Sequence, residues 1–374
     1  MKDIAQIDEN FKIADIQAED LRYYSVLEEP FSIHGLYRPR ELQRFTRMPD
    51  SFRENPAICE GTRELIPNTA GGRIRFATNS PYIAVLVELE GIMVLGHMAA
   101  TAHSGMDIMV CKRGKNEHAF KKVCMPTRFS EDADRFYKGF LKFEDYDQYD
   151  EHEVMLHMPL YNSVKSVYVG IKEGCSVFAP VEYKVKKPVY FYGASITQGG
   201  CASRPANNYP NFLSRWLDCD FVNLGFSGSA AGEPEMAEYL ASQDASAIVL
   251  DLDMRLRDPE VFRNTFEPFY RKLRSINKEV PIITMSFPKY PKIHHPVTSN
   301  YRDHVISNRI ILDTCLKAWN EGDEKLWYLD GETMFGEEDQ ECCTVDYSHP
   351  NDLGFYRMAQ ALLPLVKRAI RDAE

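Results

Sequence analysis

The 374-residue chain lacks several features that would assign it to a particular class of protein. It has no run of about 18 apolar residues, which a membrane-spanning helix would need. The segment from Met1 to Asn10 has no apolar run and no small-residue cleavage site, so it does not resemble a signal peptide. We therefore expect a cytoplasmic protein with no membrane partner.

Basic residues are outnumbered as well. The chain has 44 Lys and Arg against 55 Asp and Glu, and its formal net charge is −11. An acidic surface repels the phosphate backbone of nucleic acids, so nucleic acid is not an expected partner. A neutral substrate is compatible with this charge.

The nine cysteines are scattered and contain no C-x-x-C pair. This spacing predicts free thiols in a reducing compartment and no zinc site. His97, His103 and His118 also lack the spacing of metal ligands. We expect no metal and no cofactor.

The two halves of the chain have different patterns of apolar and polar residues. From about residue 31 to 187, short alternating runs such as 82–89 and 166–171 are separated by turn residues, which is typical of an antiparallel β-sandwich. From Pro188 onward, apolar strands alternate with amphipathic helices. That alternation predicts a parallel sheet covered on both faces, with ligands bound beyond the carboxyl ends of its strands. We place the domains at 1–187 and 188–374, joined by a short charged linker.

The first predicted strand of the second half, 189–192, leads into the sequence GASITQGG at 193–200. A phosphate-binding loop would need a Lys-Ser or Lys-Thr pair, and a dinucleotide fingerprint would need G-x-G-x-x-G. Neither is present. A nucleophilic Ser195 remains, although a serine in a glycine-rich turn is weak evidence alone.

Two further segments follow strands of the same predicted sheet. Asp346 and His349 lie before the last helix, where the Asp can orient the imidazole toward a nucleophile. The plain alternative is a surface loop with a helix cap. Gly228, after the second strand, can turn its backbone N–H toward the same edge, as an oxyanion hole requires.

Together these three segments resemble the SGNH (GDSL-like) hydrolase superfamily over roughly residues 188–374. The resemblance implies a flavodoxin-like three-layer α/β domain in which Ser195 is the nucleophile and His349, oriented by Asp346, is the base. It places Ser195 N–H and Gly228 N–H in the oxyanion hole. Arg255 lies where the superfamily usually has an oxyanion asparagine. Either its guanidinium replaces that donor, or two donors suffice, or the enzyme is impaired, or Arg255 is a surface ion-pairing residue.

A jelly-roll-like sandwich ahead of such a domain is similar to two-domain bacterial carbohydrate esterases, and most of all to the acetyl-mannan esterases of gut bacteria. The segments 103–107 and 199–205 add to this likeness, together with Asn208-Tyr209-Pro210. The resemblance implies a serine esterase that removes O-acetyl groups from oligosaccharides. It also implies that Arg204, Asn208 and Tyr209 bind substrate, with acid pairing as the alternative for Arg204.

Other interpretations stay open at this point. A lipase or thioesterase for longer acyl chains is one rival, and a non-catalytic carbohydrate-binding protein is another. The sandwich would bind carbohydrate or cover the site, and a homodimer is compatible with either arrangement. His294 and His295 are expected in a solvated loop or at the rim of the site. The three tryptophans are expected in the core, and they are Trp216, Trp319 and Trp327.

Overall fold

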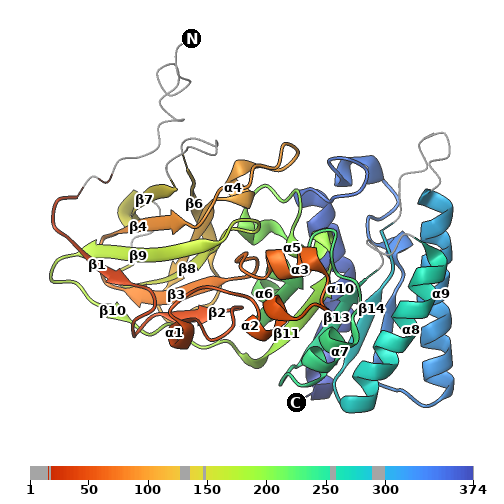
Figure 1. Cartoon of the computed structure of the whole chain (residues 1–374). Helices are drawn as coiled ribbons and strands as arrows, with labels where there is room; N and C mark the ends of the chain where they lie inside the picture. The colour runs from red at the N-terminus through yellow and green to blue at the C-terminus, as the bar shows by residue number, and fades with distance from the viewer. Residues whose placement is uncertain are drawn as a thin grey trace, which may run out of the picture.

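The computed structural model of the protein describes residues 16, 18–126, 135–145, 149–252, 258–288 and 300–373. A β-sandwich formed by the N-terminal part of the chain lies beside an α/β unit formed by the rest (Figure 1). Among the described residues, no helix combines the length and the apolar character needed to cross a membrane.

The sandwich consists of two antiparallel sheets. In the described part of the chain, one sheet has the strand order β1-β9-β4-β7 and the other has the order β10-β3-β8-β5-β6, with β2 beside β3. The first sheet is built from β1 (Leu21–Ser25), β9 (Val164–Lys172), β4 (Tyr82–Leu89) and β7 (Phe136–Lys142). The second is built from β10 (Val177–Phe178), β3 (Arg73–Thr78), β8 (His152–His157), β5 (Met106–Lys112), β6 (Ala119–Cys124) and β2 (Ser32–His34).

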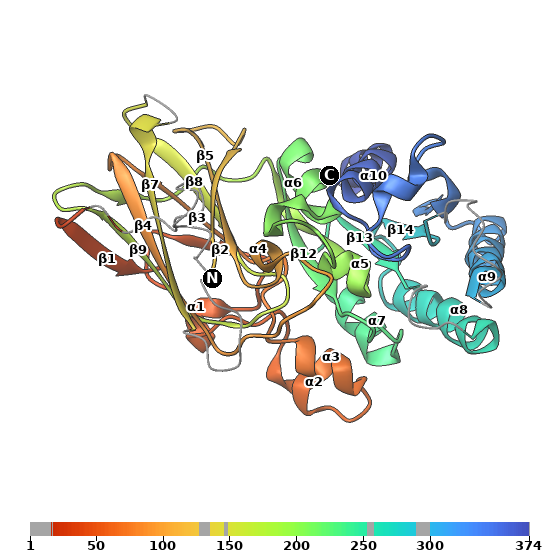
Figure 2. The ribbon, with the colours of Figure 1, turned by 90° about the horizontal axis from the view of Figure 1, so that it is seen from above.

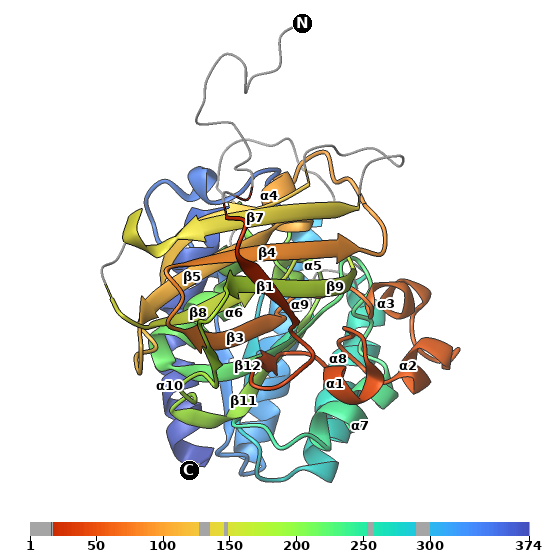
Figure 3. The same cartoon turned by 90° about the vertical axis from the view of Figure 1, so that its left-hand side faces the viewer.

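Alternation along the strands builds the core between these two sheets. Ile83, Val85 and Val87 of β4 are fully or almost fully buried, and Ile74 and Phe76 of β3 belong to the same apolar cluster. Side chains two residues apart project from the same face of a strand, so this pattern directs one face of each sheet inward. The sheet that contains β3, β5 and β8 lies between the other sheet and the α/β unit (Figures 2 and 3).

Short helical segments interrupt the sandwich loops. They are α1 (Pro39–Leu42), α2 (Asp50–Glu54), α3 (Glu60–Leu65), α4 (Ala100–His103) and the 3₁₀ turn η3 (Phe143–Asp145). The segment that carries α2 and α3 extends from the sandwich toward the α/β unit (Figure 2).

The α/β unit has a parallel sheet with the strand order β12-β11-β13-β14-β15 among the described residues. Its strands are β11 (Val185–Gly193), β12 (Cys219–Gly225), β13 (Ala247–Asp251), β14 (Ile282–Met285) and β15 (Leu326–Leu329). The order 2-1-3-4-5 is that of flavodoxin-like folds and confirms the predicted fold class. β11 begins at Val185, inside the charged segment 182–187 that we predicted to be the linker.

Helices α6 and α10 cover one face of this sheet, and α7, α8 and α9 cover the other (Figure 2). The helices and 3₁₀ turns are α5 (Ser195–Gln198), η4 (Pro205–Asn207), α6 (Tyr209–Leu217), α7 (Pro234–Ala241), α8 (Pro259–Ile276), α9 (Asn300–Asn320), η5 (Gly331–Thr333), η6 (Gln340–Cys343) and α10 (Asp352–Ala373). Val189–Tyr192 and Ala247–Leu250 are continuous apolar runs because both faces of β11 and β13 are buried.

Candidate active site

Ser195 is the first residue of the one-turn helix α5, directly beyond the carboxyl end of β11. Gly193 ends that strand, and a Cβ there would collide with the backbone carbonyl of Asp251. The missing side chain therefore lets the chain turn sharply next to β13. Ser195 is only 5% exposed, and its Oγ lies 2.9 Å from Nε2 of His349.

His349 lies in the loop between η6 and α10 and is oriented by Asp346. Its Nδ1 is 2.7 Å from Asp346 Oδ2, and its backbone N–H donates to Oδ1 of the same carboxylate at 2.7 Å. The N–H of Ser348 donates to that Oδ1 as well, at 3.0 Å. Burial raises the pKa of Asp346, but these hydrogen bonds outweigh burial and leave the pKa below its usual value.

The serine, the imidazole and the carboxylate thus form one chain of hydrogen bonds. An ionised Asp346 favours the tautomer with a proton on Nδ1, which leaves Nε2 free to accept the hydroxyl proton of Ser195. This arrangement can activate a serine for attack on an acyl carbon.

The turn that contains Gly228 begins at the end of β12 and is held by the helix that carries the serine. Gln198 of α5 is fully buried, and its Oε1 accepts the N–H of Ser227 at 2.8 Å. Phe226 N–H donates to the Gly193 carbonyl at 2.8 Å. Gly228 has φ = 64°, a left-handed conformation that glycine adopts without strain. The predicted oxyanion turn is therefore tied to the two ends of the Gly193–Gln198 segment.

The sandwich also anchors this turn. Arg47 is 1% exposed, and its guanidinium donates to the carbonyls of Gly225 at 2.5 Å, Leu65 at 2.6 Å and Asn223 at 3.3 Å. It lies over the ring of Phe226, 4.4 Å from the centroid. Burial lowers the pKa of Arg47 to about 9. Local sequence pattern does not indicate this contact, because Arg47 and its carbonyl partners on β12 lie 176 and 178 residues apart in the chain.

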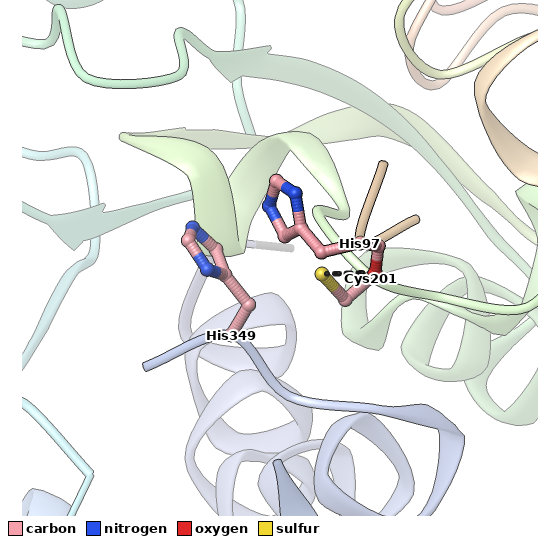
Figure 4. A group of neighbouring side chains, drawn as sticks. All are labelled: His97, Cys201 and His349. Atoms are coloured by element: carbon pink, nitrogen blue, oxygen red, sulfur yellow. Dashed lines mark hydrogen bonds between the residues drawn. The ribbon is translucent and has the colours of Figure 1, made fainter. Parts of the chain in front are cut away.

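Two other sandwich residues lie close to His349. A Cβ on Gly200 would meet the Tyr161 hydroxyl at 2.9 Å and His349 Cδ2 at 3.2 Å, so Tyr161 and His349 flank the same glycine. The rings of His97 and His349 have centroids 5.6 Å apart. The sulfur of Cys201 donates to the carbonyl of His97 at 3.4 Å (Figure 4). His97 and Cys201 were not predicted here, because their proximity depends on how the two halves pack.

The three predicted substrate-binding residues have structural partners. Arg204 pairs with the buried carboxylate of Asp107 on β5 at 3.0 Å, which is the alternative that we left open for it, and it also lies over Phe120. Asn208 is fully buried, and its side chain caps α6 by accepting from Asn211 N–H. Tyr209 is fully buried too, with its hydroxyl 2.9 Å from Thr197 Oγ1. Fully buried side chains do not reach a substrate, so we correct the assignments of Asn208 and Tyr209 to structural roles.

Arg255, His294 and His295 lie outside the described residues.

The prediction that all three tryptophans are core residues is wrong for two of them. Trp216 and Trp319 are 37% and 39% exposed. Trp327 of β15 is partly buried against the core. All nine cysteines are free.

Comparison with known proteins identifies the family of each domain. Residues 186–367 match the model of the GDSL-like lipase/acylhydrolase family. The C-terminal half is thus a GDSL-like hydrolase domain. Residues 21–177 match the model described as the N-terminus of Esterase_SGNH_hydro-type, so the chain joins the two domains of an SGNH esterase. A search of curated proteins finds no match.

Solved structures with the same two-domain arrangement are similar over nearly the whole chain. A GDSL-like lipase structure from Bacteroides ovatus ATCC 8483 is 27% identical with a TM-score of 0.80, covering 94% of this chain and 98% of that one. The salicylyl-acyltransferase SsfX3 from a tetracycline biosynthetic pathway is 17% identical with a TM-score of 0.70 (92% and 96% covered). The acetyl xylan esterase Est2A from the rumen bacterium Butyrivibrio proteoclasticus is 15% identical with a TM-score of 0.52 (95% and 100% covered). The family model supports an esterase activity, and the solved structures at 15–17% identity share the fold.

Proposed function

We propose that this SGNH domain is a serine esterase that removes O-acetyl groups from oligosaccharides through an acyl-enzyme. The observation that carries the proposal is the hydrogen-bond chain from Ser195 through His349 to Asp346. It lies beyond the carboxyl end of β11, where an α/β sheet binds its ligands. The turn that contains Gly228 follows the neighbouring strand β12.

In the first step, His349 Nε2 takes the hydroxyl proton of Ser195 as Oγ attacks the acetyl carbonyl carbon. The backbone N–H groups of Ser195 and Gly228 stabilise the oxyanion of the tetrahedral intermediate. The C–O bond to the sugar then breaks, and the sugar oxygen receives the proton held by His349. This leaves an acetyl ester on Ser195.

In the second step, His349 activates a water molecule that attacks the acetyl-enzyme. Acetate leaves, and the proton returns to Ser195 Oγ. Asp346 stays ionised throughout and stabilises the imidazolium that forms in each step. In both steps the described groups that we assign to the reaction are the three side chains and the two N–H groups.

The substrate class rests on resemblance and on charge. The acetyl xylan esterase and the Clostridium thermocellum family-two carbohydrate esterase solved with cellohexaose share this fold, at 15% and 12% identity. The net charge of −11 is compatible with a neutral acetylated sugar. Fragments of acetylated mannan are our first choice of substrate, and a cytoplasmic enzyme would act on short imported oligosaccharides.

The test is acetate release from acetylated mannan, xylan and pectin oligosaccharides, followed by mass spectrometry. Loss of acetyl groups from one of these substrates, abolished by Ser195→Ala, is the expected result. Comparison of acetyl with octanoyl aryl esters addresses the lipase or thioesterase alternative, because faster cleavage of the octanoyl ester would contradict our assignment. Binding of oligosaccharide without acetate release would instead favour a non-catalytic binding protein.

A further inference from the structure

Three side chains that commonly bind metals meet beside the proposed nucleophile. His97 comes from the loop after β4, Cys201 from the loop after α5, and His349 from the loop before α10 (Figure 4). One potential ligand atom from each side chain lies within 4.8 Å of the other two. His97 belongs to the sandwich, whereas the other two belong to the hydrolase domain, so the cluster exists only in the assembled two-domain chain.

The donor atoms suit a particular class of ion. Two imidazole nitrogens and one sulfur form a borderline-soft set that favours Zn²⁺ over Mg²⁺ or Ca²⁺. Zinc bonds of about 2.0 to 2.3 Å place tetrahedral ligands roughly 3.3 to 3.8 Å apart, so each pair of ligand atoms must approach by at most about 1.5 Å. The exposed ring of His97 can make that movement. Cys201 is a buried thiol, and a bound cation would displace its proton into solvent.

A metal on His349 is incompatible with the proposed reaction. Nε2 is the atom that accepts the proton of Ser195, and Nδ1 is the atom held by Asp346. Coordination through Nε2 removes the base, and coordination through Nδ1 removes its orienting hydrogen bond. Either mode stops acyl transfer.

We propose that His97, Cys201 and His349 form an inhibitory site for Zn²⁺ or a chemically similar divalent cation. The inhibitory effect rests on the proposed esterase function, whereas the binding of metal does not. The sandwich would thereby contribute, through His97, to the regulation of the hydrolase domain.

The first experiment measures hydrolysis of an acetyl aryl ester by the full chain at increasing Zn²⁺, with and without a chelator. We expect inhibition that the chelator reverses. His97→Gln and Cys201→Ser should keep the metal-free activity within about twofold and raise the inhibition constant at least about tenfold, since each removes one of three ligands. Cys342→Ser is the matched control, because Cys342 is an exposed thiol outside the cluster. Its sensitivity to Zn²⁺ should equal that of the parent chain, and equal inhibition of all four proteins would overturn the proposal.

The second experiment detects metal without using activity. Co²⁺ added to the Ser195→Ala chain should produce a thiolate charge-transfer band at one equivalent, and Cys201→Ser in the same background should abolish the band. The band does not depend on esterase activity, so it should appear even if the esterase proposal is wrong. Absence of the band, or its persistence after Cys201→Ser, would overturn the metal site alone.

Discussion

Arg47→Met removes the guanidinium that connects the sandwich to the turn after β12. Three hydrogen bonds to carbonyl groups are lost, and hydrogen bonds to a charged donor contribute about 1.5–3 kcal/mol each. The substitution also removes the cost of burying a charge, since none of the ion pairs within the described residues includes Arg47. When the relieved cost of burying the charge is subtracted from the lost hydrogen-bond energy, the free energy of unfolding should fall by about 2–4 kcal/mol. Denaturant titration of the full chain measures it.

The same substitution should slow catalysis. The carbonyls of Asn223 and Gly225 immediately precede the Gly228 turn, and a displacement of about 1 Å at a reacting centre costs roughly 10²-fold in rate. We expect kcat for an acetyl aryl ester to fall by about that factor, with little change in KM, at a temperature where the variant is fully folded.

Arg73→Met is the matched control. Arg73 is also a fully buried sandwich arginine, but it pairs with Asp220 and donates to the Phe221 carbonyl at 2.9 Å, at the start of β12 and away from the turn. It should destabilise the chain at least as much, because the partly buried Asp220 loses a partner. Its kcat should stay close to that of the parent chain. An unchanged kcat in folded Arg47→Met, or equal losses in both variants, would refute a specific role of Arg47 in positioning the turn.

Three further predictions concern residues around Ser195. Asp346→Asn should lower kcat by about 10⁴-fold, as loss of the orienting carboxylate does in serine hydrolases. Because hydrogen bonds hold the pKa of Asp346 below its usual value, this carboxylate should add no ionisation of its own to the pH–rate profile of the parent chain above about pH 5. Two ionisations on the acidic limb above that pH would contradict this. Gln198→Ala should leave Ser227 N–H and the Leu160 carbonyl unpaired, which should lower the free energy of unfolding by about 1–3 kcal/mol and also lower kcat. A normal kcat would show that the turn does not need this hydrogen bond. Gly200→Ala should reduce kcat by about tenfold or more without unfolding, since its methyl group would press on the Tyr161 hydroxyl and on the His349 ring. Unchanged kinetics would show that these two side chains have room to move.

Local pattern was enough to predict the architecture. Alternating runs such as 82–89 direct one face of a strand inward, and continuous apolar runs such as 247–250 mark strands buried on both faces. Because parallel strands end at one edge, Ser195 and the segment 346–349 could be placed together before their contact was known.

Contacts between the two halves could not be predicted in this way. Arg47, His97 and Tyr161 come from the sandwich, and no periodicity in the chain indicates that they face the hydrolase domain. Asn208 and Tyr209 illustrate the opposite error. The resemblance to carbohydrate esterases implied that both residues bind substrate, yet Asn208 caps a helix and Tyr209 is buried among core residues.

The most direct test of the account is the site of acylation. The full chain should be treated with a fluorophosphonate, and the adduct should be located by intact-mass measurement and peptide mapping. We predict one adduct per chain, on Ser195, which is absent in Ser195→Ala and forms far more slowly in His349→Ala. An adduct on another residue, or ester hydrolysis that persists in Ser195→Ala, would contradict the central claim.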